Sequence, residues 1–462
     1  MMTNLSGANL NNGSAVGSQS EGRDSPSNAL AAIPKYQAYK DSGVAWLGEL
    51  PRQWDAIKMK YLYRDTSVKN KASETLLSVT QTQGVVPREW VENRMVMPSG
   101  NLASFKFIKK GDFAISLRSF EGGLEYCHHD GIISPAYTVL KAKHSLLCSG
   151  YYKYLFKSQA FISELQTSVV GIREGKNISY EELRYSLLPI PKPQEQFSIA
   201  NFLDQKTAQI DEAIAIKEKQ IALLKERKQI IIQKAVTQGL NPNVPMKGSG
   251  VDWMGKVPKH WKVKKLRYLG NTQNGISAGA EYFGEGFPFV SYGDVYKNRV
   301  LPSYVKGLAK SSSGDQKLYS VLSGDVFFTR TSETVDEIGF ASICFEAIDR
   351  ATFAGFLIRF RTLSTELTKE FSKYYFNAPM MREYFVTEMN LVIRASLSQE
   401  LLKNLLVALP PVKEQMKIFE YLEDISEKID ASISLQIEQI GKLKEYKSSL
   451  INSAVTGKIK VA

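Results

Sequence analysis

The sequence has few cysteines, no long apolar run and no recognisable secretion signal. Its three cysteines, Cys127, Cys148 and Cys344, are widely spaced and odd in number. This pattern argues against a disulfide scaffold or a zinc site and predicts a reducing, cytoplasmic environment. No apolar run approaches the roughly 18 residues that a membrane span needs. Residues 1–30 lack the basic and apolar regions of a secretory signal.

Catalytic motifs are also scarce. The sequence contains no G-x-x-x-x-G-K-[ST], H-E-x-x-H or G-x-S-x-G. His128 and His129 are adjacent, and neighbouring side chains on a strand point to opposite faces, so a shared metal is not expected. The stretch Tyr282-x-Gly284-x-Gly286 resembles the glycine loop of methyltransferases, but no Asn-Pro-Pro-Tyr or Asp-Pro-Pro-Tyr follows it. A glycine-rich hairpin is the better interpretation, and the sequence predicts a protein that is not itself an enzyme.

Positive charge is in excess. The 462 residues carry a formal net charge of +12. Such a balance favours a polyanionic partner, most simply nucleic acid. Hydrophobic residues make up 43% of the chain, as in globular proteins, and its length suggests several domains.

One long segment occurs twice. A shift of 219 positions places residues 193–238 on residues 412–457 without a gap. Many positions then match, including Glu195-Gln196 on Glu414-Gln415 and Ala235-Val236-Thr237 on Ala454-Val455-Thr456. Chance does not produce so many matches in one ungapped register.

The repeated segment has the periodicity of a long helix that packs along another helix. Its apolar residues recur every seven positions in two rows, and we expect this seam at Leu203, Ile210, Ile214, Ile221, Leu224, Ile231, Leu422, Ile429, Ile433, Ile440, Leu443 and Leu450. Each copy also has a polar residue in the seam, Lys217 and Gln436. The two copies are expected to pack on each other. Two unrelated surface helices are the alternative, but polar residues between the seam positions repeat as well.

A second signature introduces each half of the chain. Ser42-Gly43-Val44-x-Trp46-x-Gly48-x-x-Pro51-x-x-Trp54 recurs from Ser249 to Trp261. The tryptophans could form a binding surface, but the glycines and prolines between them describe turns, which favours a packed lead-in to a domain.

About 140 residues lie between each lead-in and the following helix, and they contain strand-like apolar stretches and short helices. The two copies share a Gly-Asp pair before one strand, Gly111-Asp112 and Gly324-Asp325. We therefore predict an α+β fold with an internal pseudo-two-fold repeat. The predicted order is a disordered tail at 1–35, a domain at 36–192, a helix at 193–240, a domain at 241–411 and a helix at 412–462.

Polar side chains at strand ends and in loops are candidates for contacts with DNA, because such residues bind phosphates and base edges. A solvated loop residue is the alternative for each of them. Arg173 and Arg394 stand out, since both follow an isoleucine at the same place in the two copies. The full set is Gln81, Gln83, Arg118, Arg173, Lys176, Tyr292, Arg330, Ser332 and Arg394.

The lead-in, the Glu-Gln pair that opens the long helix and its Ala-Val-Thr ending together resemble the DNA specificity (S) subunits of type I restriction-modification systems. The resemblance covers residues 36–462. It implies that the two domains are target recognition domains, each reading one half of a bipartite, asymmetric DNA sequence. It also implies that the helices are spacers forming an antiparallel coiled coil. The long polar N-terminal tail departs from the commonest family pattern.

The resemblance further implies a non-catalytic subunit whose cofactors lie in its partners. Two methyltransferase (M) subunits would bring S-adenosylmethionine, and restriction (R) subunits would join with ATP and magnesium. Two alternatives come from other classes of protein. A free-standing endonuclease or methyltransferase is disfavoured by the missing motifs, and a structural coiled-coil adaptor is disfavoured by the basic charge and the divergence of the two domains.

Overall fold

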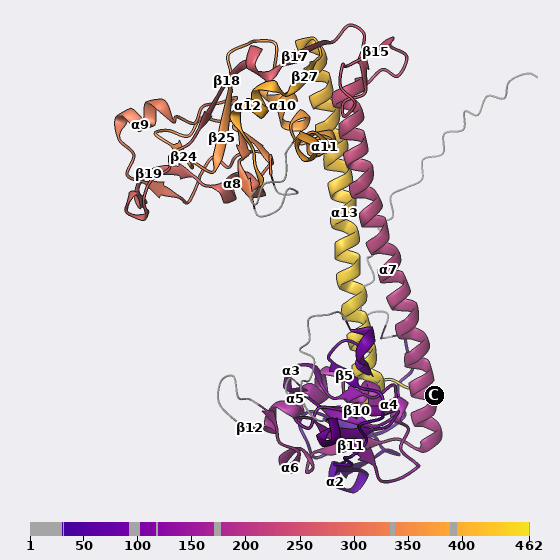
Figure 1. Cartoon of the computed structure of the whole chain (residues 1–462). Coiled ribbons are helices and arrows are strands. Elements are labelled where there is room, and N and C mark those ends of the chain that lie inside the picture. The colour runs from indigo at the N-terminus through magenta and orange to yellow at the C-terminus, as the bar shows by residue number, and fades with distance from the viewer. Residues whose placement is uncertain are drawn as a thin grey trace, which may run out of the picture. The chain divides into compact units, whose positions relative to one another are not determined.

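The computed structural model describes residues 30, 32–91, 102–116, 119–170, 177–332, 338–388 and 395–461 (Figure 1). The chain forms two compact units. The first unit combines residues up to Ile216 with Glu438–Ala462, and the second unit spans Lys217–Ile437. Each unit therefore contains one globular part and one portion of each long helix, so the two ends of the chain belong to the same unit.

The first globular part is built from short strands and helices. Its elements are β1 Tyr39–Asp41, β2 Glu49–Pro51, β3 Asp55–Lys58, α2 Met59–Leu62, β4 Tyr63–Thr66, β5 Leu77–Thr80, β6 Gly84–Pro87, η1 Arg88–Trp90, η2 Leu102–Ser104, β7 Lys106–Ile108, β8 Phe113–Ile115, α3 Ser119–Gly122, β9 Glu125–Tyr126, β10 Gly131–Ile133, β11 Thr138–Ala142, α4 Ser149–Leu155, α5 Gln159–Thr167, β12 Val169–Val170, β13 Asn177–Ile178, α6 Tyr180–Leu183 and β14 Leu187–Ile190.

The second globular part repeats this plan with a longer strand system. Its elements are β15 Met246–Gly248, β16 Lys256–Pro258, β17 Lys262–Lys265, η4 Leu266–Tyr268, β18 Gly270–Asn274, η5 Ala280–Tyr282, β19 Phe283–Val290, α8 Tyr292–Lys297, β20 Leu308–Ala309, α9 Ser313–Leu318, β21 Val326–Thr329, β22 Thr331–Ser332, β23 Ala341–Ile343, β24 Thr352–Phe353, β25 Leu357–Thr362, α10 Lys369–Tyr375, α11 Pro379–Glu388, β26 Ala395–Ser396, α12 Gln399–Asn404 and β27 Leu406–Leu409.

The central sheets of the two parts have the same topology and register. Their strand orders are β4-β11-β8-β9 and β18-β25-β21-β23. Phe113 pairs with Leu140 in the first sheet, and Val326 pairs with Phe360 in the second. Phe113 and Val326 each directly follow the Gly-Asp pair. The weak sequence likeness between the two domains therefore corresponds to a central sheet of the same design in each domain. The predicted α+β class with an internal repeat is confirmed.

The Gly-Asp pair closes the same turn in both sheets. The carboxylate of Asp112 accepts a hydrogen bond from the backbone N–H of Lys109 at 3.0 Å, and that of Asp325 accepts from Leu322 at 2.8 Å. The backbone of each pair also bonds to a buried cysteine, Cys127 or Cys344. These two cysteines are therefore equivalent packing residues of the repeat, a relation that their spacing in the sequence did not reveal.

The two long helices are α7, Pro193–Gln238, and α13, Val412–Val455. Each is followed by a glycine with a positive φ, 74° at Gly239 and 71° at Gly457, as is common just beyond helix ends. Every one of the 12 predicted seam residues is buried or half-buried. The apolar stripe that the seven-residue period predicts is thus largely removed from water.

Polar pairs along the helices set their relative direction. In the second unit, Lys217 Nζ donates to Gln436 Oε1 at 3.1 Å, and Lys228 pairs with Asp430 at 2.6 Å. The residue number rises along α7 where it falls along α13, so the helices are antiparallel in this unit. Lys217 and Gln436 also occupy equivalent positions in the two copies of the repeated segment. Two copies of one helix bring equivalent residues together only near the midpoint of an antiparallel pair.

A buried glutamine joins each globular part to its long helix. Gln196 is 1% exposed; its side-chain oxygen accepts from the N–H of Cys148 at 2.8 Å, and its nitrogen donates to the Pro191 carbonyl at 2.8 Å. Gln415 is 0% exposed and makes the matching bonds to Thr368 and Pro410, at 3.0 and 2.9 Å. Cys148 and Thr368 are the residues before α4 and α10. The Glu-Gln pair of the sequence therefore marks this joint.

A carboxylate about two turns further along each long helix makes a second repeated joint. Asp204 accepts from Lys153 at 2.7 Å and from the Tyr154 hydroxyl at 2.6 Å. The same two bonds connect Glu423 to Lys373 and Tyr374, at 2.6 and 2.5 Å. Since 204 and 423 differ by the repeat distance, both units dock the helix α4 or α10 onto the long helix in the same way.

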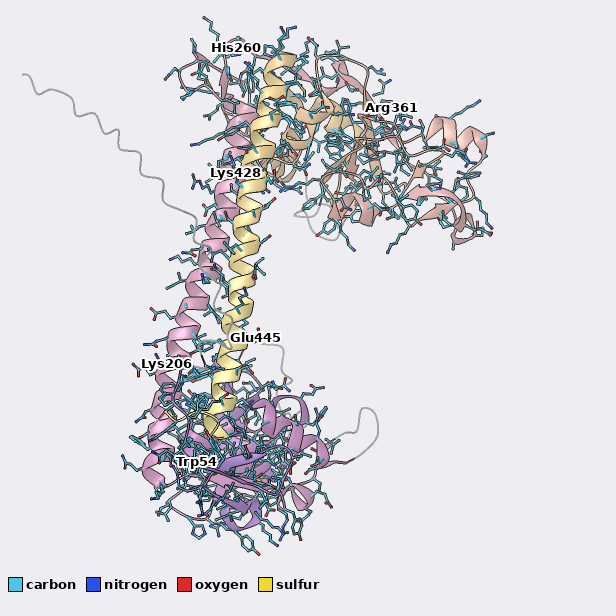
Figure 2. The ribbon with its side chains drawn as sticks, turned by 180° about the vertical axis from the view of Figure 1, so that it is seen from behind. Trp54, Lys206, His260, Arg361, Lys428 and Glu445 are labelled. Atoms are coloured by element: carbon cyan, nitrogen blue, oxygen red, sulfur yellow. The ribbon has the colours of Figure 1, made fainter. Side chains whose placement is uncertain are left out.

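The lead-in is structural, as its turn residues predicted. Trp54 and Trp261 are 0% and 1% exposed, and Trp54 lies inside the first globular part (Figure 2). Each tryptophan packs against the glycine that follows a long helix: a Cβ on Gly457 would lie 3.1 Å from the Trp54 ring, and one on Gly239 would lie 3.3 Å from the Trp261 ring. The end of α13 thus belongs to the core of the first unit.

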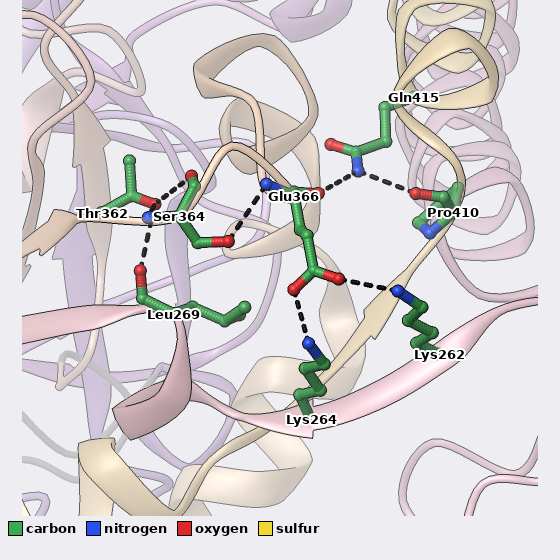
Figure 3. A network of polar contacts seen from close by, with 8 residues as sticks. All are labelled: Lys262, Lys264, Leu269, Thr362, Ser364, Glu366, Pro410 and Gln415. Carbon is green, nitrogen blue, oxygen red and sulfur yellow. Dashed lines mark hydrogen bonds and ion pairs between the residues drawn. The ribbon is translucent and has the colours of Figure 1, made fainter.

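Glu366 anchors the link between β25 and α10 (Figure 3). Its carboxylate accepts from Lys262 at 2.8 Å and from Lys264 at 2.5 Å, and its backbone carbonyl accepts from Gln415 at 2.6 Å. Hydrogen bonds from the two lysines lower the pKa of Glu366 to about 2. This ionised group therefore ties the strand β17 to the buried joint.

Some boundaries differ from those predicted. Helix α13 ends at Val455, before the predicted end of that segment at 462, because the chain turns at Gly457 to pack on the N-terminal lead-in. Lys460 donates its N–H to the carbonyl of Pro34, which the sequence had placed in the tail. The Tyr282-x-Gly284-x-Gly286 stretch is not a hairpin turn: it lies at the start of β19, where the pairing with β20 has a bulge.

Replacing Gln196 by leucine should lower the free energy of unfolding by about 3 kcal/mol, because it leaves a buried N–H and a buried carbonyl without partners. Denaturant unfolding of the whole chain measures this. The control is Gln194→Leu, which changes an exposed residue in the same turn of α7 and should have little effect. Equal destabilisation by both changes would show that the buried joint is unimportant.

Replacing Glu366 by glutamine should destabilise the chain at neutral pH but not in strong acid. The folded-state pKa lies below the ordinary value of 4.5, so the contribution of the carboxylate is present above about pH 4.5 and is lost as the pH falls toward about 2. Thermal unfolding of both proteins across this range tests the prediction. A difference that does not depend on pH would contradict it.

Candidate nucleic-acid interface

In the second unit, two segments that are distant in the sequence meet at one end of the central sheet. Arg330 follows β21, and its backbone carbonyl accepts from the N–H of Leu397 at 2.7 Å. The adjacent strand β22 pairs with β26, with Thr331 opposite Ser396 and Ser332 opposite Ala395. The structure thus places Arg330 and β22 beside β26, whereas Arg394, which precedes β26 in the sequence, lies outside the described residues.

Arg330 is partly buried and held in place. Its Nη1 donates to the carbonyl of Gly355 at 3.4 Å, and its backbone N–H donates to the carbonyl of Phe356 at 2.9 Å. A guanidinium has five N–H donors. One of them is used in the bond to Gly355, and a guanidinium fork of this kind is suited to a phosphate or a guanine edge.

Two further arginines lie on the strand β25, which pairs with β21, and hold it in place. Arg361 makes two bonds of 2.6 Å to the carboxylate of Asp325. Arg359 is 6% exposed and donates to the carbonyl of Ser320 at 2.6 Å, and burial lowers its pKa to about 10. Both side chains fix β25 to the segment that precedes β21, which is a structural role.

Tyr292 begins α8, a short helix capped by Ser291, whose hydroxyl accepts from the N–H of Asp294. Its ring stacks on that of Tyr296 at 5.8 Å between centroids. Since α8 contacts β21, Tyr292 lies on an element that packs against the strand leading to Arg330.

In the first unit, Gln81 and Gln83 lie in the turn between β5 and β6, and both are exposed. The Thr80 hydroxyl accepts from the N–H of Gln83 at 3.0 Å, and Gly84 completes the turn with a φ of 73°. The side chain of Gln81 lies against Gly122, at the end of α3. Helix α3 directly follows Arg118 and contacts β13, which directly follows Lys176.

A buried ion pair holds the turn that carries Gln81. Lys157 donates to the backbone carbonyl of Gln81 at 3.1 Å and to Glu125 at 2.7 Å. The Glu125 side chain is 0% exposed, and burial raises its pKa against the opposing effect of Lys157. The lysine therefore connects the surface turn to a carboxylate in the interior, a role that the sequence did not indicate.

Four predicted contacts lie outside the described residues: Arg118, Arg173, Lys176 and Arg394. Ser332 is described as part of β22, but its side chain is not. The DNA-contact predictions for all nine residues stay predictions. Phe356, which the sequence analysis missed, is 63% exposed beside Arg330.

Over the described ranges, no group of three or more His, Cys, Asp or Glu residues is arranged to hold a metal ion. The ring of His128 contacts Tyr126, whereas that of His129 contacts Trp90. Of the helices that the structure describes, none is long and apolar enough to cross a membrane.

Comparison with known proteins agrees with the resemblance seen in the motifs. A family model described as the type I restriction modification DNA specificity domain matches residues 258–439. The type I restriction enzyme EcoKI specificity subunit of Escherichia coli (strain K12) is 26% identical over 328 residues, which cover 68% of this chain and 66% of that relative. The MjaVIII specificity subunit of Methanocaldococcus jannaschii is 23% identical and covers 77% of this chain and 80% of the relative. The chain is thus similar to type I restriction enzyme specificity subunits over most of its length, and residues 258–439 match the DNA specificity domain itself.

Solved structures of type I specificity subunits share the fold. One, from work on "complex assembly and conformational transition of the type I R-M system", superposes with a TM-score of 0.67 at 16% identity and covers 88% of this chain and 98% of that chain. The HsdS subunit from Thermoanaerobacter tengcongensis gives a TM-score of 0.53 at 16% identity, covering 89% and 98%. At this identity the likeness establishes the architecture of two globular parts and long helices, and nothing finer.

If Arg330 contacts DNA as the sequence predicts, replacing it by alanine should weaken binding of the chain to its DNA target by about tenfold and relax base choice at one position. Competition binding against target duplexes with single-base changes measures both effects. Lys259→Ala is the control: it also removes one exposed positive charge from the second globular part, and it should leave base choice unchanged. If the two variants lose affinity equally for all sequences, Arg330 contacts only the backbone.

Proposed function

We propose that this chain is the non-catalytic, sequence-reading subunit of a type I restriction-modification complex. Each globular part is a target recognition domain and reads one half of a bipartite, asymmetric DNA target. The helix pair docks two M subunits and, through them, R subunits. The partners carry the cofactors, with S-adenosylmethionine in the M subunits and ATP with magnesium in the R subunits, and the complex acts on DNA in the cytoplasm.

The observation that carries this proposal is the repetition of the joints between domain and helix. Gln196 and Gln415 make matching bonds, and so do Asp204 and Glu423. Two equivalent frames in one chain suit two copies of one partner. The candidate contact surfaces differ between the units, since the first has a glutamine-bearing turn and the second has Arg330 beside Phe356. Different contact surfaces on two equivalent frames are suited to the recognition of two different half-sites.

Exposed apolar residues on the helices support the docking of partners. Ile216, Leu223 and Ile230 recur every seven residues along α7 and are 53%, 54% and 48% exposed. They lie outside the seam, whose own apolar residues are buried or half-buried. The equivalent position to Ile216 on α13 is Leu435, which is 44% exposed. A helix from a partner that packs along this stripe would cover apolar surface now in contact with water.

Methylation mapping tests the proposal directly. The chain is co-expressed with the candidate M subunit encoded nearest to it, and methylated adenines are mapped across the host DNA. The proposal expects one bipartite motif with a gap of fixed length, and no methylation when either protein is expressed alone.

Two results would contradict the proposal. A stable complex that methylates a continuous, ungapped motif would show that the two globular parts do not read separate half-sites. A chain that binds neither the M subunit nor DNA in a salt-sensitive manner would revive the structural adaptor.

A further inference from the structure

Phe356 is an exposed aromatic residue in an otherwise buried stretch of the second unit. The five residues before it, from 351 to 355, and the four after it, from 357 to 360, are all buried. Phe356 itself is 63% exposed. The exposed ring of Phe356 therefore contributes nothing to the core beneath it, although the residues on both sides are part of that core.

The backbone that presents Phe356 is fixed from several directions. The N–H of Gly355 donates to the carbonyl of Ile276 at 2.7 Å, and that of Ala354 donates to the carbonyl of Val290 at 3.0 Å. A Cβ on Gly355 would lie 2.1 Å from the Ser277 hydroxyl oxygen and 3.0 Å from the Ile276 carbonyl oxygen, so the two segments pack closely here. The phenyl ring therefore projects from a rigid platform, which lowers the entropy lost when it contacts a partner.

The surroundings of Phe356 are those of the candidate DNA surface. Its carbonyl accepts the backbone N–H of Arg330, and Leu357 pairs with Thr329 at the end of β21. The strand pair β22–β26, which contains Thr331 and Ser396, follows Arg330 directly, so polar residues lie on the segment that continues from this backbone contact. Hydrogen-bonding groups beside one apolar group match a thymine-containing base step, where polar base edges lie next to the C5-methyl group in the major groove.

We propose that Phe356 is a specificity-determining residue that contacts the C5-methyl group of a thymine in the half-site read by the second globular part. This inference rests on the function proposed above. It assigns apolar readout to Phe356 and hydrogen-bonding readout to its neighbour Arg330. Every half-site in which an adenine is methylated contains an A·T pair, so a thymine is available on one of the strands.

The test couples one change in the protein to one change in the DNA. The full chain, in complex with its M subunit, is titrated with target duplexes in which each thymine is replaced in turn by deoxyuridine, which lacks only the methyl group. For the wild-type complex, one replacement in one half-site should weaken binding about fourfold, as expected for one buried methyl group. Phe356→Ala should weaken binding to the unmodified target about tenfold and abolish the response to that replacement.

Two variants serve as controls. Leu363→Ala removes another exposed apolar side chain, 71% exposed just beyond the other end of β25, and should leave the deoxyuridine response unchanged. Phe356→Leu keeps an apolar group and should retain part of the response. Because position 356 is exposed, all variants should unfold at the wild-type temperature, which separates the loss of a contact from the loss of the fold.

Several outcomes would overturn the inference. If Phe356→Ala responds to every deoxyuridine as the wild type does, the residue reads no methyl group. If the variant instead changes the fluorescence of 2-aminopurine in the target without affecting the deoxyuridine response, Phe356 inserts between bases. Both results leave a mapped bipartite motif in place. The absence of any motif with the wild-type complex would instead refute the proposed function itself.

Discussion

The structure depends on the joint at which a buried glutamine ties a globular part to a long helix. Gln196 and Gln415 each bond the residue before an aromatic helix and the carbonyl of the proline-bearing link. A side chain with both a donor and an acceptor is needed, because it satisfies one N–H and one carbonyl at a place without water. Apolar residues of the long helix such as Ile418 and Leu422 also pack into the core of the second globular part, and the glutamine adds a directional polar contact to this packing.

The two halves of the chain preserve this joint and diverge elsewhere. Both sheets have the same strand order, the same turn closed by the Gly-Asp pair and an equivalent buried cysteine. The second half has an additional long strand, β19, with a bulge and the partner strands β20 and β24. Residues that position the domain are thus repeated, whereas the turns and strand ends that face solvent are not. This is the pattern expected of one frame that carries two different binding surfaces.

Parts of the structure that repeat at short range were predictable from the sequence. The seven-residue period gave the seam, and proline and glycine gave the helix ends closely, although α13 ends before the predicted boundary because Gly457 turns the chain onto Trp54. The role of the Glu-Gln pair was not predictable, since the partners of Gln196 lie in other elements. Phe356 was missed for a related reason: in sequence it is one more apolar residue of a strand, and only the fold shows that its neighbours are buried while it is exposed.

The central claim is that each globular part acts as an independent unit of recognition on a shared helical frame. The most direct measurement exchanges the segment from β15 to β27 for that of a relative with a different target, keeps both long helices, and maps methylated adenines made with the same M subunit. The account predicts that one half-site changes while the other half-site stays the same. A change in both half-sites, or no change in either, would contradict it.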